Sequence, residues 1–96
     1  MATARGTIHD FHSHTYLSDG ELSPVELIRR AAVAGYATLA ITDHCGIGDL
    51  RRILSTLKAD RDAVRDAWPE IEVFVGVELT HLPPEVIPRA AYQARE

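Results

Sequence analysis

Three runs of β-forming residues alternate with three runs of helical periodicity, and this alternation most constrains how the 96-residue chain can fold. The β-forming runs lie around Thr7–His12, in ATLAIT at 37–42 and in IEVFVGVE at 71–78. Short connections join each run to the helical pattern that follows it. Strands connected through helices in this way form parallel sheets with right-handed crossovers. The sequence therefore predicts an α/β fold.

Local signals support the first two helices. Ser23 and Glu26 have the spacing of a capping box, and Pro24 fits the first helical position, where its missing N–H costs nothing. Gly35 is typical of the residue that ends such a helix. A second helix is expected from about Asp49 to Trp68, because its apolar residues recur at helical spacing: Leu50, Ile53, Leu54, Leu57 and Val64.

The chain ends in a third helical pattern over 83–96, in which several prolines compete to open the helix: Pro83, Pro84 and Pro88. Three parallel strands leave open edges, whereas a (β/α) barrel contains about eight such units and roughly 250 residues. We therefore expect residues 1–96 to form a single domain that is the opening part of a TIM-like barrel. An open sheet edge also favours a homo-oligomer formed by strand pairing.

Composition is typical of one soluble domain, with 46% hydrophobic and 25% charged residues. Cys45 is the only cysteine, which excludes an internal disulfide and fits a cytoplasmic location. The sequence shows no signal peptide and no apolar run of about 20 residues, so we expect no membrane association. The net charge of −4 and the mixed charges of KADRDAVRD argue against a nucleic-acid partner.

Two histidines two residues apart, His12 and His14, follow the first strand. If strand geometry continues through them, their side chains point the same way, Asp10 shares their orientation and His9 faces away. Two neutral imidazoles suit one divalent cation, which Asp10 could support by orienting one ring. A histidine pair alone is a weak signal, because such pairs also occur on ordinary surfaces.

Residues with metal-binding side chains also follow the other strands. Asp19 lies in the loop after the first strand, Asp43 and His44 follow the second, and Glu78 lies at the end of the third. The carboxyl ends of parallel strands meet at one edge of the sheet, where ligands bind in such folds. The aspartates are also good turn formers, and Glu78 could simply end a strand. Their coincidence with the histidine pair favours a metal site.

Other residues near these strand ends allow two interpretations. Gly20 and Gly46 permit tight turns beside a site, although loop glycines need no function. Cys45 is either a soft metal ligand or, as we favour, a small buried residue. His81 lies three residues after Glu78 and is equally consistent with a substrate or metal contact and with a surface histidine.

The stretches DFHSHTYLSDG, ELSPVELIRRAAVAGYATLAITDH and VFVGVEL occur in an order that resembles the amino-terminal part of the PHP family, named for polymerase and histidinol phosphatase. The resemblance covers nearly the whole chain. The closing GVELTHLPPEVIPRAAYQARE is similar to the small stand-alone members, some of which are histidinol phosphatase-like.

The resemblance implies a distorted (β/α)7 barrel that holds up to three zinc, manganese or iron ions and hydrolyses phosphate esters. It implies that His12 and His14 hold one ion, that Glu78 bridges it to a second, and that Asp19 with His44 binds the third. The family takes further ligands from later strands, two histidines in mid-chain and an Asp-x-His near the carboxyl terminus. This sequence stops before them, so its site is expected to be incomplete.

In the complete domain, we expect a metal-activated water to attack a small-molecule phosphate ester, with Asp43 orienting a neighbouring group and not binding metal itself. One alternative is an amidohydrolase-type enzyme, which also has His-x-His after its first strand, although TDH at 42–44 and Glu78 favour the phosphoesterase. Another alternative is no enzyme at all, either an inactive truncated fragment or a metal-binding module that assembles with another chain. The sequence does not identify the substrate or the metals.

Overall fold

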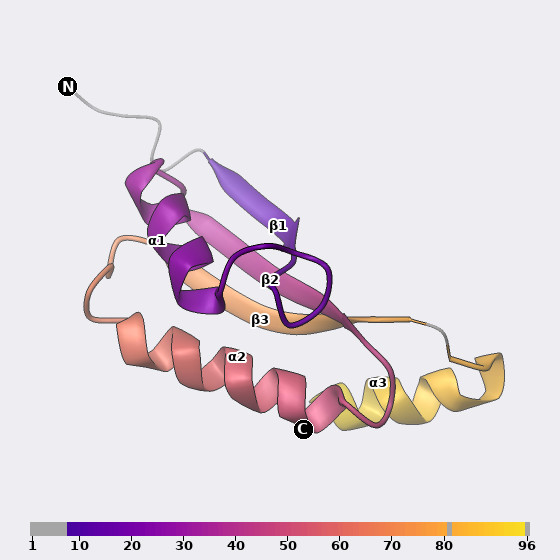
Figure 1. Ribbon diagram of the computed structural model, residues 1–96. Coiled ribbons are helices and arrows are strands. Elements are labelled where there is room, and N and C mark those ends of the chain that lie inside the picture. The colour runs from indigo at the N-terminus through magenta and orange to yellow at the C-terminus, as the bar shows by residue number, and fades with distance from the viewer. Residues whose placement is uncertain (1–7, 81, 96) are drawn as a thin grey trace.

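The three predicted strands form one parallel sheet. The computed structural model describes residues 8–80 and 82–95, with strands β1 (His9–Ser13), β2 (Thr38–Cys45) and β3 (Glu72–Leu79) side by side in the order β1-β2-β3 (Figure 1). Both strand pairs are parallel, and a helix follows each strand. The predicted α/β class is confirmed for this part of the chain.

Helix α1 (Pro24–Val33) begins where the capping signals predicted. Ser23 Oγ accepts a hydrogen bond from the backbone N–H of Glu26 at 3.1 Å, which is one half of a capping box. The Glu26 carboxylate binds two arginines of the same helix. Gly35 follows with a φ of +90°, a conformation in which other residues are strained, and it ends α1 as predicted.

The later helix boundaries differ from the predictions. Helix α2 (Leu50–Val64) ends four residues before Trp68, which packs against the core from the turn that follows. The helical spacing of Trp68 therefore reflects burial and not continued helix. Among the prolines, Pro84 opens a short 3-10 helix, η2 (Pro84–Val86), and α3 (Ile87–Arg95) follows it directly. None of these described helices is long and apolar enough to cross a membrane.

The helices cover one face of the sheet. Leu39 and Ile41 of β2 are buried in a core that they share with helix residues such as Leu57. Two aromatic side chains of other strands, Phe11 and Phe74, are 67% and 49% exposed. Because these aromatic side chains are exposed, no helix of the described residues covers the second face of the sheet.

One extra residue in β1 interrupts its pairing with β2. The register shifts between the pairs Asp10–Leu39 and Ser13–Ile41. Three steps along β1 therefore match two along β2, which is a β-bulge. A bulge reverses the alternation of side chains on the strand that carries it, so orientations predicted from a period of two change across it.

The bulge reverses two predicted orientations. His9 lies opposite Thr38, with its Nδ1 2.9 Å from Thr38 Oγ1, so it shares the face of Thr38 and, by alternation along β2, of His44. The prediction that His9 faces away from the histidine pair is therefore wrong. Asp10 lies opposite Leu39 and lines a pocket against α1, on the helix-covered face. The prediction that Asp10 shares the orientation of the histidine pair is also wrong.

Candidate metal centre

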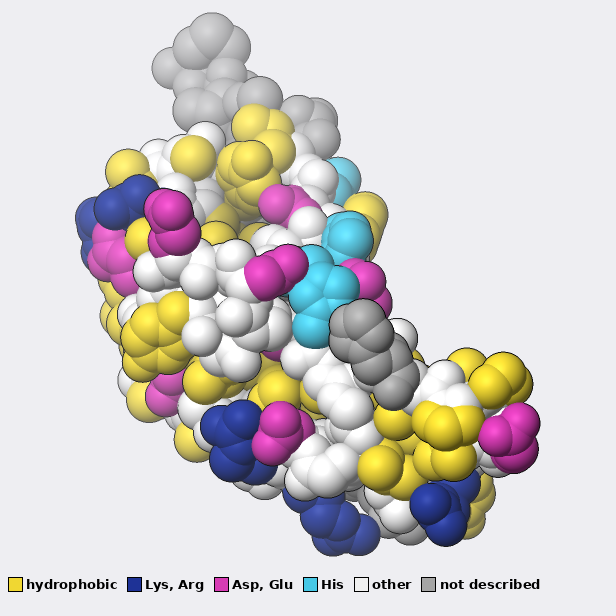
Figure 2. Space-filling model, turned by 45° about the vertical axis from the view of Figure 1, so that its right-hand side comes forward, with side chains coloured by type: hydrophobic (Ala, Val, Ile, Leu, Met, Phe, Trp, Pro, Cys, Tyr) yellow, Lys and Arg dark blue, Asp and Glu magenta, His cyan; other side chains and the backbone are white. Residues whose placement is uncertain are grey.

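The side chains predicted to bind metal meet at the carboxyl end of the sheet. Figure 2 shows histidine and acidic side chains gathered together on one side of the molecule. Their donor atoms form two groups, each with all of its donors within 4.8 Å: His12, His14 and Glu78 in one, and His14, Asp19 and His44 in the other. His14 belongs to both groups. Three strand ends thus contribute to a single centre.

The first group, His12–His14–Glu78, has spacings suited to one ion. His14 Nε2 lies 3.1 Å from His12 Nε2 and 3.3 Å from Glu78 Oε1. Two ligands of a tetrahedral zinc ion, each at roughly 2.0–2.1 Å, would lie about 3.3 Å apart. His12 Nε2 and Glu78 Oε1 are closer, at 2.6 Å, and form a hydrogen bond. These residues therefore fit a divalent cation with only a small opening of that bond.

The second group, His14–Asp19–His44, lies directly beside the first. Asp19 Oδ1 is 2.7 Å from His14 Nδ1, and Asp19 Oδ2 is 3.3 Å from His44 Nε2. The second carboxylate oxygen of Glu78 lies 3.3 Å from His44 Nδ1. Glu78 thus contacts His12 and His14 through one carboxylate oxygen and His44 through the other, so its carboxylate lies between the two groups.

Thr80 holds the ring of His44 in place. The Thr80 hydroxyl lies 3.0 Å from the backbone carbonyl of Glu78, to which it can donate, and 2.7 Å from His44 Nδ1. The other ring nitrogen, Nε2, lies 3.3 Å from Asp19 Oδ2. In the tautomer with its proton on Nδ1, the lone pair of Nε2 faces Asp19, an arrangement that a cation between the two would satisfy.

Both acidic residues of the centre favour the ionised form. The hydrogen bond from His12 lowers the pKa of Glu78, against partial desolvation and with help from the nearby charge of His44. Partial desolvation raises the pKa of Asp19, but the hydrogen bond from His14 and the charges of His14 and His44 outweigh it and leave that pKa below its ordinary value. The two carboxylates are therefore ionised at neutral pH, the form in which they bind cations.

Asp43 lies outside both groups. Its fully buried carboxylate accepts hydrogen bonds from the backbone N–H and the hydroxyl of Thr15, at 2.6 and 2.7 Å, and from the hydroxyl of Ser18 at 2.6 Å. Asp43 is therefore a structural anchor for the loop after β1, and its oxygens are already engaged by three donors.

Two residues near the first strand act through the backbone. Asp10 Oδ1 accepts a hydrogen bond from the backbone N–H of His12 at 2.9 Å, so Asp10 supports the bulge and does not contact an imidazole through this bond.

Gly20 lies against the preceding loop so closely that a Cβ on it would be 2.4 Å from the carbonyl oxygen of His14. Glycine is required at position 20 because backbone occupies the space of a side chain.

The remaining sequence predictions have mixed outcomes. Cys45 is buried in the core, and burial raises the pKa of its thiol, so the structure agrees with a small buried residue. A Cβ on Gly46 would meet no atom within 4 Å, so packing does not require a glycine there. His81 lies outside the described residues.

Sequence reasoning missed three hydroxyl residues that hold the centre together: Thr15, Ser18 and Thr80. Each lies within four residues of a predicted ligand, which is the only signal that could have singled it out. Serine and threonine are too common in loops after strands for that signal to carry weight.

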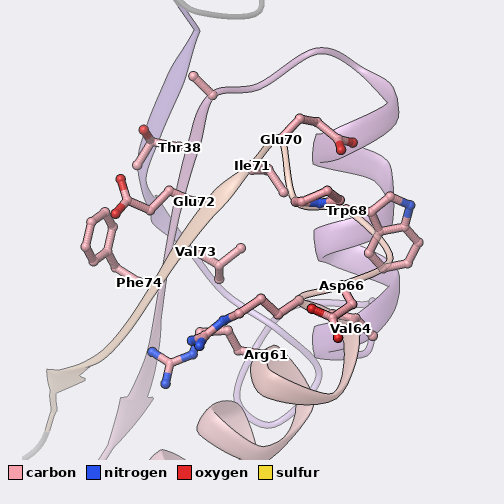
Figure 3. Close-up of a pocket in the computed structure, with 13 residues that line it drawn as sticks. Thr38, Arg61, Val64, Asp66, Trp68, Glu70, Ile71, Glu72, Val73 and Phe74 are labelled. Atoms are coloured by element: carbon pink, nitrogen blue, oxygen red, sulfur yellow. The ribbon is translucent and has the colours of Figure 1, made fainter.

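A large groove lies at the opposite end of the strands. It has a volume of about 780 Å³ and is formed by the start of β2 and β3 and by the end of α2, with Trp68 and Phe74 among its lining residues (Figure 3). None of the five predicted ligands lines it. The groove is therefore separate from the candidate centre.

Comparison with known proteins gives relatives of much greater length. The uncharacterized protein MJ1295 of Methanocaldococcus jannaschii is 44% identical over 87 residues, which are 91% of this chain and 40% of that protein. The 5'-3' exoribonuclease Rnm of Salmonella typhimurium is 35% identical over 78 residues, 81% of this chain and 24% of that protein. A 3',5'-nucleoside bisphosphate phosphatase of Chromobacterium violaceum is 51% identical over 41 residues, 43% of this chain and 14% of that protein. The chain spans less than half the length of these relatives.

The same region matches a protein-family model. The model for the PHP domain matches residues 10–94, a span that includes both ligand groups and all of the three strands except His9, the first residue of β1. The match agrees with the resemblance drawn from the sequence motifs, and it covers most of the chain. The chain therefore belongs to the PHP domain family.

Proposed function

We propose that this chain is the amino-terminal part of a metal-dependent phosphoesterase. The observation that carries the proposal is the pair of overlapping ligand groups, His12–His14–Glu78 and His14–Asp19–His44, at the carboxyl ends of three parallel strands. Membership of the PHP domain family and the names of its hydrolase relatives support the same conclusion. Divalent cations held there would supply an activated water and neutralise charge on a phosphoryl group.

The residues have distinct roles in this proposal. His12 and His14 would hold one ion, with Glu78 as a ligand shared with a second, and Asp19 and His44 would hold a further ion. Thr80 would keep the His44 ring in place through its contact with Nδ1. Zinc, manganese and iron are the candidate metals, up to three ions in the complete domain, and His81 is a candidate contact for substrate or metal.

The substrate that we propose is a small phosphate ester. The sequence motifs resemble histidinol phosphatase-like members, whereas the relatives with named activities are an exoribonuclease and a nucleoside bisphosphate phosphatase. We therefore place nucleotide phosphates ahead of histidinol phosphate. The net charge of −4 argues for a short nucleotide over a long nucleic acid, because a long phosphate backbone is bound through many Lys and Arg contacts.

The proposal also covers the fold and the setting of the complete protein. The three βα units would be the opening part of a distorted (β/α)7 barrel, whose later strands would pair with the free edge of β3 and cover the sheet face that carries Phe74. The single, buried Cys45 fits a reducing, cytoplasmic setting.

A phosphatase assay with matched variants tests the enzymatic proposal. The complete protein that contains this chain is stripped with chelator, reloaded with Mn²⁺, Zn²⁺ or Fe²⁺, and offered a nucleoside 3',5'-bisphosphate, histidinol phosphate and an anilide. Metal-dependent phosphate release that Glu78→Gln abolishes and Glu72→Gln preserves is expected, since Glu72 lies at the other end of β3. Anilide hydrolysis without phosphate release would support the amidohydrolase alternative instead.

The non-enzyme alternative has its own support in the unpaired edge of β3, the last strand of the described sheet. A metal-binding module that assembles with another chain would bind ions, form a dimer or larger species through that edge, and release no phosphate. Sedimentation analysis together with the same assay separates this outcome from a monomeric phosphatase.

A further inference from the structure

A buried carboxylate and a single hydroxyl connect the end of β2 to the loop after β1, the two segments that carry His44 and Asp19 of the second ligand group. Asp43 and Thr15 are both fully buried, and a buried charge is costly unless several donors satisfy it. Asp43 receives three such hydrogen bonds, all between 2.6 and 2.7 Å, from Thr15 and Ser18. The end of β2 is thereby fixed against the loop after β1.

Ser18 is the central residue of this connection. Its hydroxyl carries one proton, which goes to Asp43 at 2.6 Å in preference to Asp19 Oδ1 at 3.5 Å. Its oxygen remains free to accept the backbone N–H of His44 at 3.2 Å. The same hydroxyl therefore contacts the backbone of one predicted ligand and belongs to the residue directly before another.

The loop itself is closed on both sides of Asp19. The carbonyl oxygen of Thr15 accepts hydrogen bonds from the backbone N–H of Ser18 at 3.1 Å and of Gly20 at 2.9 Å. Asp19 lies between these two residues, so its backbone has little freedom. Its carboxylate is directed at His14 and His44.

We propose that Ser18, Asp43 and Thr15 form a positioning latch that aligns Asp19 with His44, and so sets the metal affinity of the His14–Asp19–His44 group. The latch makes none of its hydrogen bonds to the side chains of His12, His14 or Glu78, so its loss should weaken cation binding at the His14–Asp19–His44 group more than at the His12–His14–Glu78 group. The affinity part of this inference rests on the proposed metal site, whereas the alignment part stands on the loop alone.

Deletion of one hydroxyl tests the latch, with a matched deletion as the control. Ser18→Ala removes the link between Asp43 and the His44 backbone. Ser13→Ala removes a hydroxyl from β1 that donates to the backbone carbonyl of Ala40 at 2.9 Å and takes no part in the latch. Ser18→Thr keeps a hydroxyl at the latch position and should restore the parent behaviour.

Zn²⁺ titration of the full chain by calorimetry gives the first readout. Partners that orient metal ligands change metal affinity by roughly 10- to 100-fold when they are removed. In Ser18→Ala we expect Zn²⁺ affinity to fall by that factor at the His14–Asp19–His44 group and to change by less than about threefold at the His12–His14–Glu78 group. Ser13→Ala should bind Zn²⁺ at both groups as the parent does. Equal weakening at both sites, an unchanged titration, or equal effects of the two variants would overturn the proposal.

Amide hydrogen exchange of the metal-free chain gives a second, independent readout. Ser18→Ala should raise exchange of the loop amides from 17 to 20 by at least about tenfold, while amides of α2 stay as in the parent, because the core is untouched. If the parent binds no Zn²⁺, the proposed metal site fails. The exchange result then decides the alignment part alone, and unchanged loop exchange overturns it.

Discussion

Replacement of Gly20 by alanine adds only one methyl group, but it should disturb the candidate centre. A Cβ at this position would lie 2.4 Å from the carbonyl oxygen of His14, 2.8 Å from the carbonyl carbon of His14 and 3.0 Å from that of Thr15, whereas ordinary contacts begin at 3.4 Å. The obstructing atoms are backbone, and the Thr15 N–H is bound to Asp43. They cannot rotate away as a flexible side chain would.

The expected cost follows from this overlap. Forcing an extra methyl group into a packed site costs roughly 1–3 kcal/mol, part of which is offset by the roughly 0.4–1 kcal/mol that alanine gains by restricting the unfolded chain. A net loss of about 1–2 kcal/mol lowers the melting temperature of a chain of this length by roughly 4–16 °C. The loop should also shift Asp19 away from His14 and His44, since Asp19 is the adjacent residue.

Calorimetric melting of the metal-free chain measures the first effect, and Zn²⁺ titration measures the second. Gly46→Ala is the matched control, because a Cβ there meets no atom within 4 Å and it should change stability by less than about 0.5 kcal/mol. If Gly20→Ala melts and binds Zn²⁺ as Gly46→Ala does, the close packing of the loop is refuted.

Three further predictions concern features outside the centre. Gly35→Ala should lower the free energy of unfolding by roughly 1–2 kcal/mol in urea titrations, because φ is +90° there. Arg29 and Arg30 lower the pKa of Glu26 to about 2, so the stability that the ionised carboxylate contributes is present above its ordinary pKa of 4.5 and is lost as pH falls towards 2. The difference in melting temperature between the parent chain and Glu26→Gln should therefore shrink from pH 6 to pH 2.5, and a constant difference would contradict this. Burial raises the pKa of the Cys45 thiol and blocks access to it, so iodoacetamide at pH 8 should modify it at least tenfold more slowly than in the urea-unfolded chain.

The sequence was most informative where the signals are local. Ser23 and Pro24 predicted the start of α1 because capping depends on neighbouring residues. The meeting of Asp19, His44 and Glu78 was predictable because parallel strands place their carboxyl ends at one edge, whatever the loops between them.

The β-bulge and the end of α2 were not predictable from these signals. The bulge at β1 depends on pairing with β2, so a period of two along β1 alone gave wrong orientations for His9 and Asp10. Trp68 fits the helical period and yet lies beyond α2, because burial from a turn produces the same spacing as burial from a helix. The Ser18–Asp43 hydrogen bond likewise joins residues 25 positions apart.

The number of divalent ions bound per chain tests the central proposal most directly. The chain is dialysed against Zn²⁺ or Mn²⁺, and bound metal is measured by mass spectrometry for the parent and for two histidine variants. His14 contributes to both ligand groups, whereas His9 shares the sheet face with His44 but belongs to neither group. We predict that the parent binds at least one ion, that His9→Ala keeps it, and that His14→Ala loses it. A parent that binds no ion, or equal losses in the two variants, would contradict a metal centre at these strand ends.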